Sequence, residues 1–407
     1  MGFQQGLSGL SAAAKSLDVI GNNIANAGTV GFKQSQAQFA DVFANSLAGS
    51  GGGASGIGVS VGTIAQQFTQ GNITTTNNSL DMAVSGNGLF RMSDGGSITY
   101  TRNGQFQLDQ NGFIVNSAGA RVTGYLPNAA GVIVPTAPAD IQISTADLLP
   151  NATTTIAAGL NLNANSAVIP AAPVFDPTNP ATFNNSTSTT VYDSLGGSHV
   201  AALYFAKTGT NAWNVYLTVD GVNTQAANAP LSAMTFNTNG TLATPATAVT
   251  STAFVPAGAA SQTLAINFAS TSQFGSAFGV NALNQNGYTS GTMTGFSTGS
   301  DGIISGRYSN GQTQTLGQVV LANFSNPQGL EPLGGNQWAE TSTSGAPLVG
   351  APGTAGLGVL QSSAVEDSNV DLTAELVNMI TAQRLYQANA QTVKTQDQVL
   401  QTIVNLR

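Results

Sequence analysis

The stretch LDVIGNNIANAGTVGFK, residues 17 to 33, starts like the last turns of an amphipathic helix and closes on Gly-Phe-Lys. Those turns hold Gly21, Asn22, Asn23 and Asn26, although other residues form helices more readily. A glycine permits close approach of another backbone, and asparagines four positions apart share a helix face. We therefore expect this helix to end in a crowded bundle, where Asn22 and Asn26 bond a neighbour. The alternative is that the asparagines cap a helix that faces solvent.

Both ends of the chain carry the 3-4 apolar spacing of a coiled-coil seam. The expected N-terminal assembly residues are Phe3, Leu7, Leu10, Leu17, Ile20 and Ile24. The expected C-terminal assembly residues are Leu372, Leu376, Met379, Tyr386, Val393 and Leu400. One such helix alone would suggest ordinary packing on its own domain. Matched seams at both ends, without a comparable helical pattern between them, favour pairing of the terminal helices.

The start of the C-terminal helix is marked by polar residues. Asn369 or Asp371 can cap the helix, and acidic side chains favour its positive end. Glu366 and Asp367, together with Asp371, are best explained as charge at the helix start rather than as a metal site.

Composition excludes several classes of protein. Only 7% of the 407 residues are charged, the net charge is −8, and there is no cysteine. An acidic chain lacks the Lys and Arg clusters that bind phosphates, so nucleic acid is not an expected partner. A membrane span needs about 20 mostly apolar residues, whereas the long uncharged stretches of this chain are rich in polar side chains, so we expect no membrane insertion. The N-terminus does not resemble a secretory signal, so any export is expected to need no cleaved leader.

The region between the two helices predicts β structure. Asn-Gly pairs suited to hairpin turns recur along it, and plausible strands lie at 89–92, 112–115, 200–205, 213–219 and 316–324. The fold class is therefore mainly β with terminal α-helices, in a nested multidomain architecture with two β-rich outer domains. We expect an inner helical polymerisation domain, coiled-coil-like, at 1–35 and 366–407. A linker at 36–70 joins it to a β-rich middle domain at 71–145 and 285–365, into which an outer β domain at 146–284 is inserted.

Catalytic chemistry is not indicated. A Ser-His-Asp arrangement would need His199, the only histidine, with Asp193, Ser194 and Ser198 close in sequence. A turn between two strands explains these residues better. No phosphate-binding glycine loop, paired-carboxylate pattern or metal cluster is evident, so we expect no catalytic residues, cofactors or metals.

Four stretches resemble the bacterial flagellar rod and hook proteins. LDVIGNNIANAGTVGFK matches their signature, here Gly21, Asn22, Asn23, Ala25, Asn26, Gly31, Phe32 and Lys33. The C-terminal segment that starts at SNVDLTAELVNMITAQRLYQ resembles the closing helix of the same family. Two internal stretches also match the family: SLDMAVSGNGLFRM with YTRNGQFQLDQNGFIV, and GRYSNGQTQTLGQVVLANFSNPQGL. FADVFANS and the chain length are closer to hook proteins than to the shorter distal rod protein.

The resemblance implies a structural subunit of the flagellar hook, the curved, flexible tube that transmits torque from rod to filament. It implies a homopolymer, with a distal rod protein, a hook cap protein, a hook-filament junction protein and the flagellar type III export apparatus as partners. Location would be extracellular. Two alternatives are a distal rod protein, which should form a straight polymer, and an extracellular adhesin or carbohydrate-binding β protein. Trp213 is the only tryptophan in the inserted region, which disfavours a stacked sugar.

Overall fold

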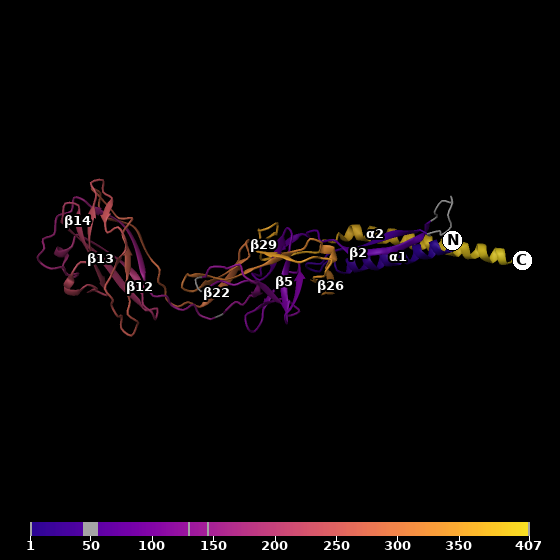
Figure 1. Cartoon of the computed structure of the whole chain (residues 1–407), viewed down its shortest axis with the longest axis horizontal. Helices are drawn as coiled ribbons and strands as arrows, with labels where there is room; N and C mark the ends of the chain where they lie inside the picture. The colour runs from indigo at the N-terminus through magenta and orange to yellow at the C-terminus, as the bar shows by residue number, and fades with distance from the viewer. Residues whose placement is uncertain (1, 44–55, 129–130, 145, 406–407) are drawn as a thin grey trace. The chain divides into compact units, whose positions relative to one another are not determined.

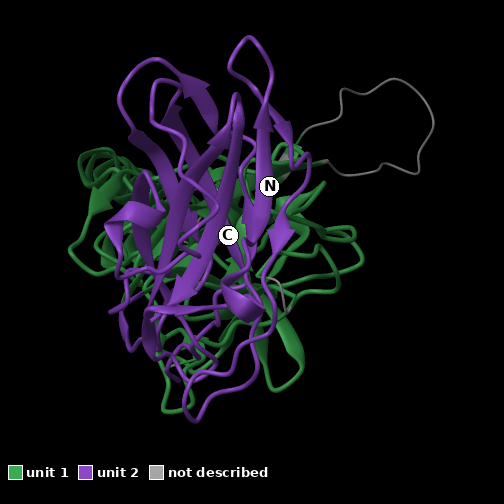
Figure 2. Cartoon of the chain, turned by 90° about the vertical axis from the view of Figure 1, so that its left-hand side faces the viewer, with its two compact units in different colours: residues 1–145, 295–307, 313–407 green, residues 146–294, 308–312 purple. Residues whose placement is uncertain are grey.

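The structure, a computed structural model, describes residues 2–43, 56–128, 131–144 and 146–405 (Figure 1). It divides into two compact units, coloured in Figure 2. Unit 1 comprises residues 1–145, 295–307 and 313–407, and unit 2 comprises residues 146–294 and 308–312. The chain is mainly β with one long helix near each end, as the sequence predicts.

Two antiparallel helices form one part of unit 1, α1 (Gly2–Ala25) and α2 (Leu372–Asn405) (Figure 1). Gly6 of α1 faces Val393 and Asn389 of α2, whereas residues near the end of α1 face the start of α2. A Cβ atom on Gly6 would lie 2.9 Å from the Val393 Cγ2 atom. Glycine at this position therefore allows the two helices to approach each other closely.

A β-hairpin packs beside the helices. It consists of β1 (Ser35–Phe43) and β2 (Gly56–Gln66), and both strands contact α1. Gln5 donates to the Gly56 carbonyl at 2.6 Å, and Val59 N donates to Ser8 Oγ. The linker prediction for 36–70 is therefore wrong for these strands. It rested on the glycine-rich run 49–58, most of which lies outside the described residues.

The remaining strands of unit 1 form one large sheet and two short pairs. The large sheet has the main order β22-β23-β24-β9-β5-β6-β27-β26, and five short strands join its sides. Its members are β5 (Leu89–Asp94), β6 (Ser97–Thr101), β7 (Gln107–Leu108), β8 (Ile114–Val115), β9 (Arg121–Tyr125), β10 (Ala139–Asp140), β22 (Met293–Thr298), β23 (Ile303–Tyr308), β24 (Thr313–Val319), β25 (Leu321–Asn323), β26 (Glu331–Gly334), β27 (Gln337–Ala339) and β28 (Leu348–Gly350). The short pairs are β4 (Met82–Ser85) with β29 (Val359–Ser362), and β3 (Ile73–Thr75) with β30 (Ala364–Glu366).

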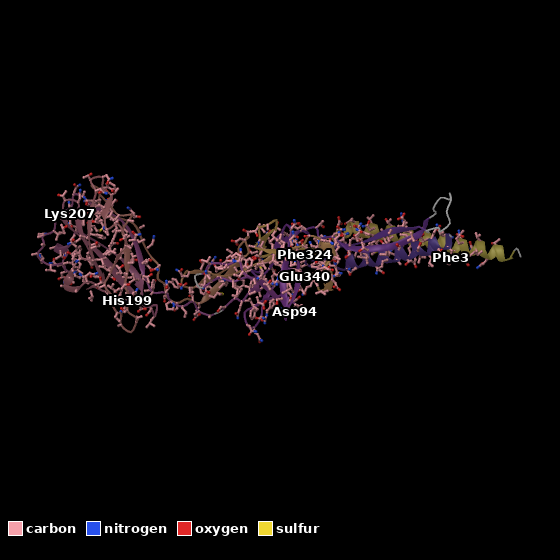
Figure 3. The ribbon with its side chains drawn as sticks, in the orientation of Figure 1. Phe3, Asp94, His199, Lys207, Phe324 and Glu340 are labelled. Atoms are coloured by element: carbon pink, nitrogen blue, oxygen red, sulfur yellow. The ribbon has the colours of Figure 1, made fainter. Side chains whose placement is uncertain are left out.

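Aromatic side chains fill one core of unit 1. Tyr100 packs edge-on against Phe324 at 4.8 Å, and Trp338 packs against Phe68, which follows the hairpin. Tyr100 also donates to Glu340, and burial raises the pKa of Tyr100. The labels for Phe324 and Glu340 in Figure 3 mark this core.

Unit 2 is a sandwich of two sheets around a single apolar core. One sheet contains β11 (Thr155–Asn163), β18 (Val249–Thr250), β19 (Ala265–Asn267), β20 (Ser272–Phe274) and β21 (Gly279–Gln285). The other contains β12 (Asn185–Tyr192), β13 (Ser198–Gly209), β14 (Ala212–Val219), β15 (Val222–Asn223), β16 (Ser232–Phe236) and β17 (Leu242–Thr244). Alternate residues of β14 point inward, as a half-buried strand requires, and Trp213, Val215 and Leu217 are fully buried.

Candidate assembly site

Asn23 joins the end of α1 to the start of the hairpin. Its amide donates to the Ser35 carbonyl at 2.8 Å, and its carbonyl accepts from Ser35 N at 2.9 Å. The side chain is only 1% exposed, so both polar ends are satisfied without water. This pair of bonds fixes the direction in which the chain leaves the helix.

Lys33, Glu366 and Arg102 form a buried ion network. Lys33 Nζ lies 2.7 Å from Glu366 Oε1, and Arg102 Nη1 lies 3.1 Å from Glu366 Oε2. Lys33 and Glu366 have side chains with 0% exposure. Burial lowers the pKa of Lys33 and of Arg102, while the Glu366 carboxylate opposes both shifts. The network links the N-terminal segment, the first part of the large sheet and the strand that precedes α2.

Further bonds hold the three ions in place. Lys33 donates to the Thr69 carbonyl at 2.7 Å, and Arg102 donates to the carbonyls of Val84 and Gly86. Gly71 N donates to Glu366 Oε1 at 2.8 Å. A buried charge pair is tolerated only with such additional bonds, and these bonds explain why this network is stable with almost no exposed surface.

Gly31 and Phe32 complete the signature. Gly31 has φ +71, and a Cβ atom there would lie 2.5 Å from Asn103 N. Gly31 N donates to the Glu366 carbonyl, and Phe32 is buried beside it. The backbone conformation and the close approach both require glycine.

The start of α2 is tied to the same junction. Asp371 caps α2, because its carboxylate accepts from Thr373 N and Ala374 N at 2.9 and 3.1 Å. Asn369 instead accepts from Gln34 N at 2.7 Å. Glu366 is the buried partner of Lys33 at the end of β30, so its assignment as helix-start charge was wrong.

The other signature residues make few contacts outside their own helix within one chain. Asn26 donates to the carbonyl and the side chain of Asn22, so these amides bond each other within one chain. Apart from its chain neighbours and the adjacent backbone of α1, no heavy atom of the described residues lies within 4 Å of a Cβ atom built on Gly21, and Ala25 is exposed. Within one chain, Gly21 therefore supports no close backbone contact.

The predicted seam residues are only partly covered within one chain. On α1, Ile20 is buried, Leu10, Leu17 and Ile24 are half-buried, and Phe3 and Leu7 are exposed. Phe3 is labelled in Figure 3. On α2, Met379 and Val393 are half-buried, and Leu372, Leu376, Tyr386 and Leu400 are exposed. Leu376 and Leu400 are 46% and 53% exposed, so both present large apolar side chains to solvent.

Other apolar residues of α2 and of the hairpin are also exposed. Val377, Ile380 and Leu385 of α2 are each more than half exposed. Phe39, Val61 and Ile64 of the hairpin are also exposed. Large apolar side chains exposed in such number on neighbouring elements mark a site of association. We call these residues, with the exposed seam residues, the assembly surface.

Nothing in the described residues resembles a catalytic centre. His199 Nδ1 lies 2.7 Å from Asp220 Oδ2, and His199 Nε2 lies 3.1 Å from Asp193 Oδ2, so neither nitrogen faces a serine. Ser194 Oγ instead accepts from Ala260 N. No group of three or more potential metal ligands occurs in the described part of the chain. No described helix is long and apolar enough to cross a membrane.

Sequence patterns did not identify Arg102, Glu366 or Gln34 as junction residues. The available signal was the rarity of charged residues. Because only 7% of the residues are charged, few of them would meet by chance in one buried cluster. Their partners lie hundreds of positions apart, so spacing could not pair them.

Comparison with known proteins agrees with the architecture. The sequence matches the families described as "Flagella basal body rod protein" over residues 3–33 and "Flagellar hook protein FlgE/F/G D1 domain" over 83–148. It matches "Flagellar basal body protein FlaE D2 domain" over 161–288 and "Flagellar basal body rod FlgEFG protein C-terminal" over 361–406.

Full-length relatives are also similar. The flagellar hook protein FlgE of Escherichia coli (strain K12) is 45% identical over 410 residues, with 100% of both chains covered. That of Borreliella burgdorferi is 32% identical, covering 99% of this chain and 98% of the relative. The crystal structure of Helicobacter pylori flagellar hook protein FlgE2 aligns with a TM-score of 0.54 at 14% identity, covering 72% of this chain and 100% of that one, and shows a shared fold. The chain therefore belongs to the flagellar hook protein FlgE family, and it is a structural protein of the flagellar hook, not an enzyme.

Proposed function

We propose that the assembly surface of α1, α2 and the hairpin is where hook subunits join to form a curved, flexible tube. The observation that carries this proposal is the exposure of large apolar side chains on three elements of one unit, such as Leu7, Leu376 and Phe39. Each buried leucine contributes about 1.5–3 kcal/mol, so burying many of them in every subunit provides a strong drive to associate. In this proposal the helical domain of 1–35 and 366–407 is the polymerisation domain.

The ends of such a tube imply the remaining partners. Head-to-tail contacts between identical subunits leave two unlike ends. We assign the distal rod protein to one end, and the hook cap protein and then the hook-filament junction protein to the other. The chain has no cysteine, so no disulfide constrains an unfolded chain during passage through the flagellar type III export apparatus. The tube would then lie outside the cell.

The test replaces Leu376 and Leu400 together by Asp. Tube formation should fail, because two carboxylates would be forced into an apolar interface where unpaired charge is costly. The soluble subunit should melt as wild type does, because both side chains are already exposed within one chain. Sedimentation of polymer and a melting curve of the monomer measure the two effects.

A matched control replaces Thr392 and Thr402 by Asp. Both threonines are exposed on α2, and the change adds the same charge to the same helix without removing a large apolar side chain. This variant should polymerise at nearly the wild-type concentration. Polymer formed by the leucine variant at the wild-type concentration would refute the assignment of α2 to assembly.

A further inference from the structure

A polar groove lies where α1, the start of the hairpin and α2 meet. Its volume is about 360 Å³. The lining residues that bear on its chemistry are Asn23, Gln34, Gln67, Glu375, Asn378 and Leu385. Glu375 is the only ionisable residue in the lining, so the groove has an acidic character.

Only one of the two carboxylate oxygens of Glu375 has a hydrogen-bond partner among the described residues. Its Oε1 atom accepts from Gln34 Nε2 at 2.6 Å. Its Oε2 atom is buried and has no hydrogen-bond partner among the described residues. The whole residue is 3% exposed, and a buried carboxylate oxygen without a donor costs free energy. The site therefore lacks a donor, and a cationic donor would satisfy it best.

Arg384 is a cationic donor that has no acceptor among the described residues. It is exposed on α2 and makes no hydrogen bond or ion pair with the described residues. It follows Val377 and Ile380 at helical spacing, so the three share one outward stripe whose apolar members are 58% and 51% exposed. Arg384 follows Glu375 by nine positions, which places the two about 180° apart around α2.

Opposite placement of donor and acceptor on one helix suits head-to-tail association. Arg384 cannot reach its own groove from the far side of α2, but it can reach the groove of a second copy. Two other cations are less suitable. Lys394 projects about 100° from the direction of Glu375, and Lys15 lies on α1, which forms a wall of the groove itself.

Resting on the proposed function, we propose that Arg384 of one subunit inserts into the groove of the next and pairs with Glu375. The guanidinium has five donors, so it can reach the free Oε2 atom while the surrounding amides bind its other N–H groups. Val377 and Ile380 would be buried beside it against the same neighbour. The contact thus combines an apolar stripe with one charge pair that fixes its register.

Mixing two variants of the full chain tests this contact. Glu375→Lys and Arg384→Glu should each raise the critical concentration for polymerisation at least ~10-fold, because each leaves two like charges facing one another. An equimolar mixture should polymerise near the wild-type concentration. When the two variants alternate, every contact pairs opposite charges. The native Arg384 and Glu375 meet at one contact, and the two introduced side chains meet at the next with their charges exchanged.

Rescue in the mixture requires contact between copies, so it separates this contact from a role of Glu375 within its own chain. A mixture that polymerises no better than the separate variants would overturn the proposal. Lys394→Glu makes the same charge change elsewhere on α2, and a loss equal to that of Arg384→Glu would also overturn it. If the wild-type chain itself formed no tube, the proposed function would be refuted instead.

Discussion

The sandwich of unit 2 and the helical part of unit 1 use apolar residues in opposite ways. In unit 2 one core encloses Phe205, Trp213 and Leu217, which have no exposed surface, although Leu195 and Val222 outside that core are 68% and 71% exposed. In the helical part, Leu7 and Leu400 are each 53% exposed, although both helices are long and regular. The sandwich encloses a large apolar core within one chain, whereas in our proposal the helices bury most of their apolar side chains only with further copies.

Polar groups follow this division only in part, because buried Asn185 Oδ1 and Thr218 Oγ1 of unit 2 also lack a hydrogen-bond partner among the described residues. Trp213 of the sandwich donates to Gln273 at 2.9 Å, within its own core. In the helical part, the Glu375 Oε2 atom and Arg384 each lack a partner among the described residues. The junction around Lys33, Arg102 and Glu366 is intermediate between these two cases. Its buried charges are paired within one chain, as in a folded core. It also holds the ends of α1 and α2, whose outer surfaces remain exposed.

The largest expected effect on this comparison comes from Glu366→Ala. Loss of the carboxylate leaves the buried cations Lys33 and Arg102 without their counter-ion, which should cost about 3–5 kcal/mol. Unit 1 should lose this stability, and unit 2 should not change. Each unit contains one of the two tryptophans, Trp338 and Trp213, so denaturation followed by fluorescence in single-tryptophan backgrounds reports each unit separately.

The control for this variant is Asp140→Asn. It removes a partner from the ion pair with Arg121, in which the Arg121 and Asp140 side chains are 40% and 28% exposed. Such surface pairs contribute about 0–1 kcal/mol, so the shift in unit 1 should be small. Equal losses in both variants would show that burial of the Glu366 network adds nothing.

A smaller effect is expected from Asn23→Ala. The substitution removes both bonds to Ser35 and leaves the partly buried backbone N–H and carbonyl of Ser35 unpaired, at a cost of about 1–3 kcal/mol. Amide exchange should accelerate at Ser35 and along β1, while the large sheet keeps its protection. Asn22→Ala, at an exposed position of the same turn, should leave exchange at Ser35 unchanged. Protection at Ser35 as in wild type would show that the hairpin is held without the two Asn23 bonds.

Local patterns in the sequence predicted the elements better than their partners. The 3-4 spacing predicts both helices, and alternation predicts β13 and β14, because periodicity is a local property of the chain. The hairpin of 35–66 was missed because its two strands flank a glycine-rich run that has the composition of a linker. The strands pair on the surface of α1, and no local pattern reveals that surface.

The candidate site shows the same limit. Asn22 and Asn26 bond each other within one chain, which their shared face does not reveal, and their bond to a neighbour stays a prediction. Lys33 and Glu366 are brought together by the fold from opposite ends of the sequence. Spacing in sequence predicts a shared face, but it does not reveal which element covers that face.

The smallest expected effect is a pH dependence confined to unit 2. Hydrogen bonds to Asp220 and then to Asp193 raise the pKa of His199 above its ordinary value of 6.5, and partial burial opposes the shift. Stability from this site is therefore complete below pH 6.5 and is lost as pH rises through the raised pKa of the folded state. The pKa values of both aspartates are lowered, so their contribution is present above about pH 3.8 and is lost on acidification below it.

Fluorescence of Trp213 during denaturation should show a modest decline in unit 2 stability on the alkaline side, which His199→Gln should abolish, while Trp338 in unit 1 should show no such step. A decline that persists in His199→Gln would place the titrating group elsewhere, and an equal decline in unit 1 would remove the distinction between a self-contained sandwich and its partner unit.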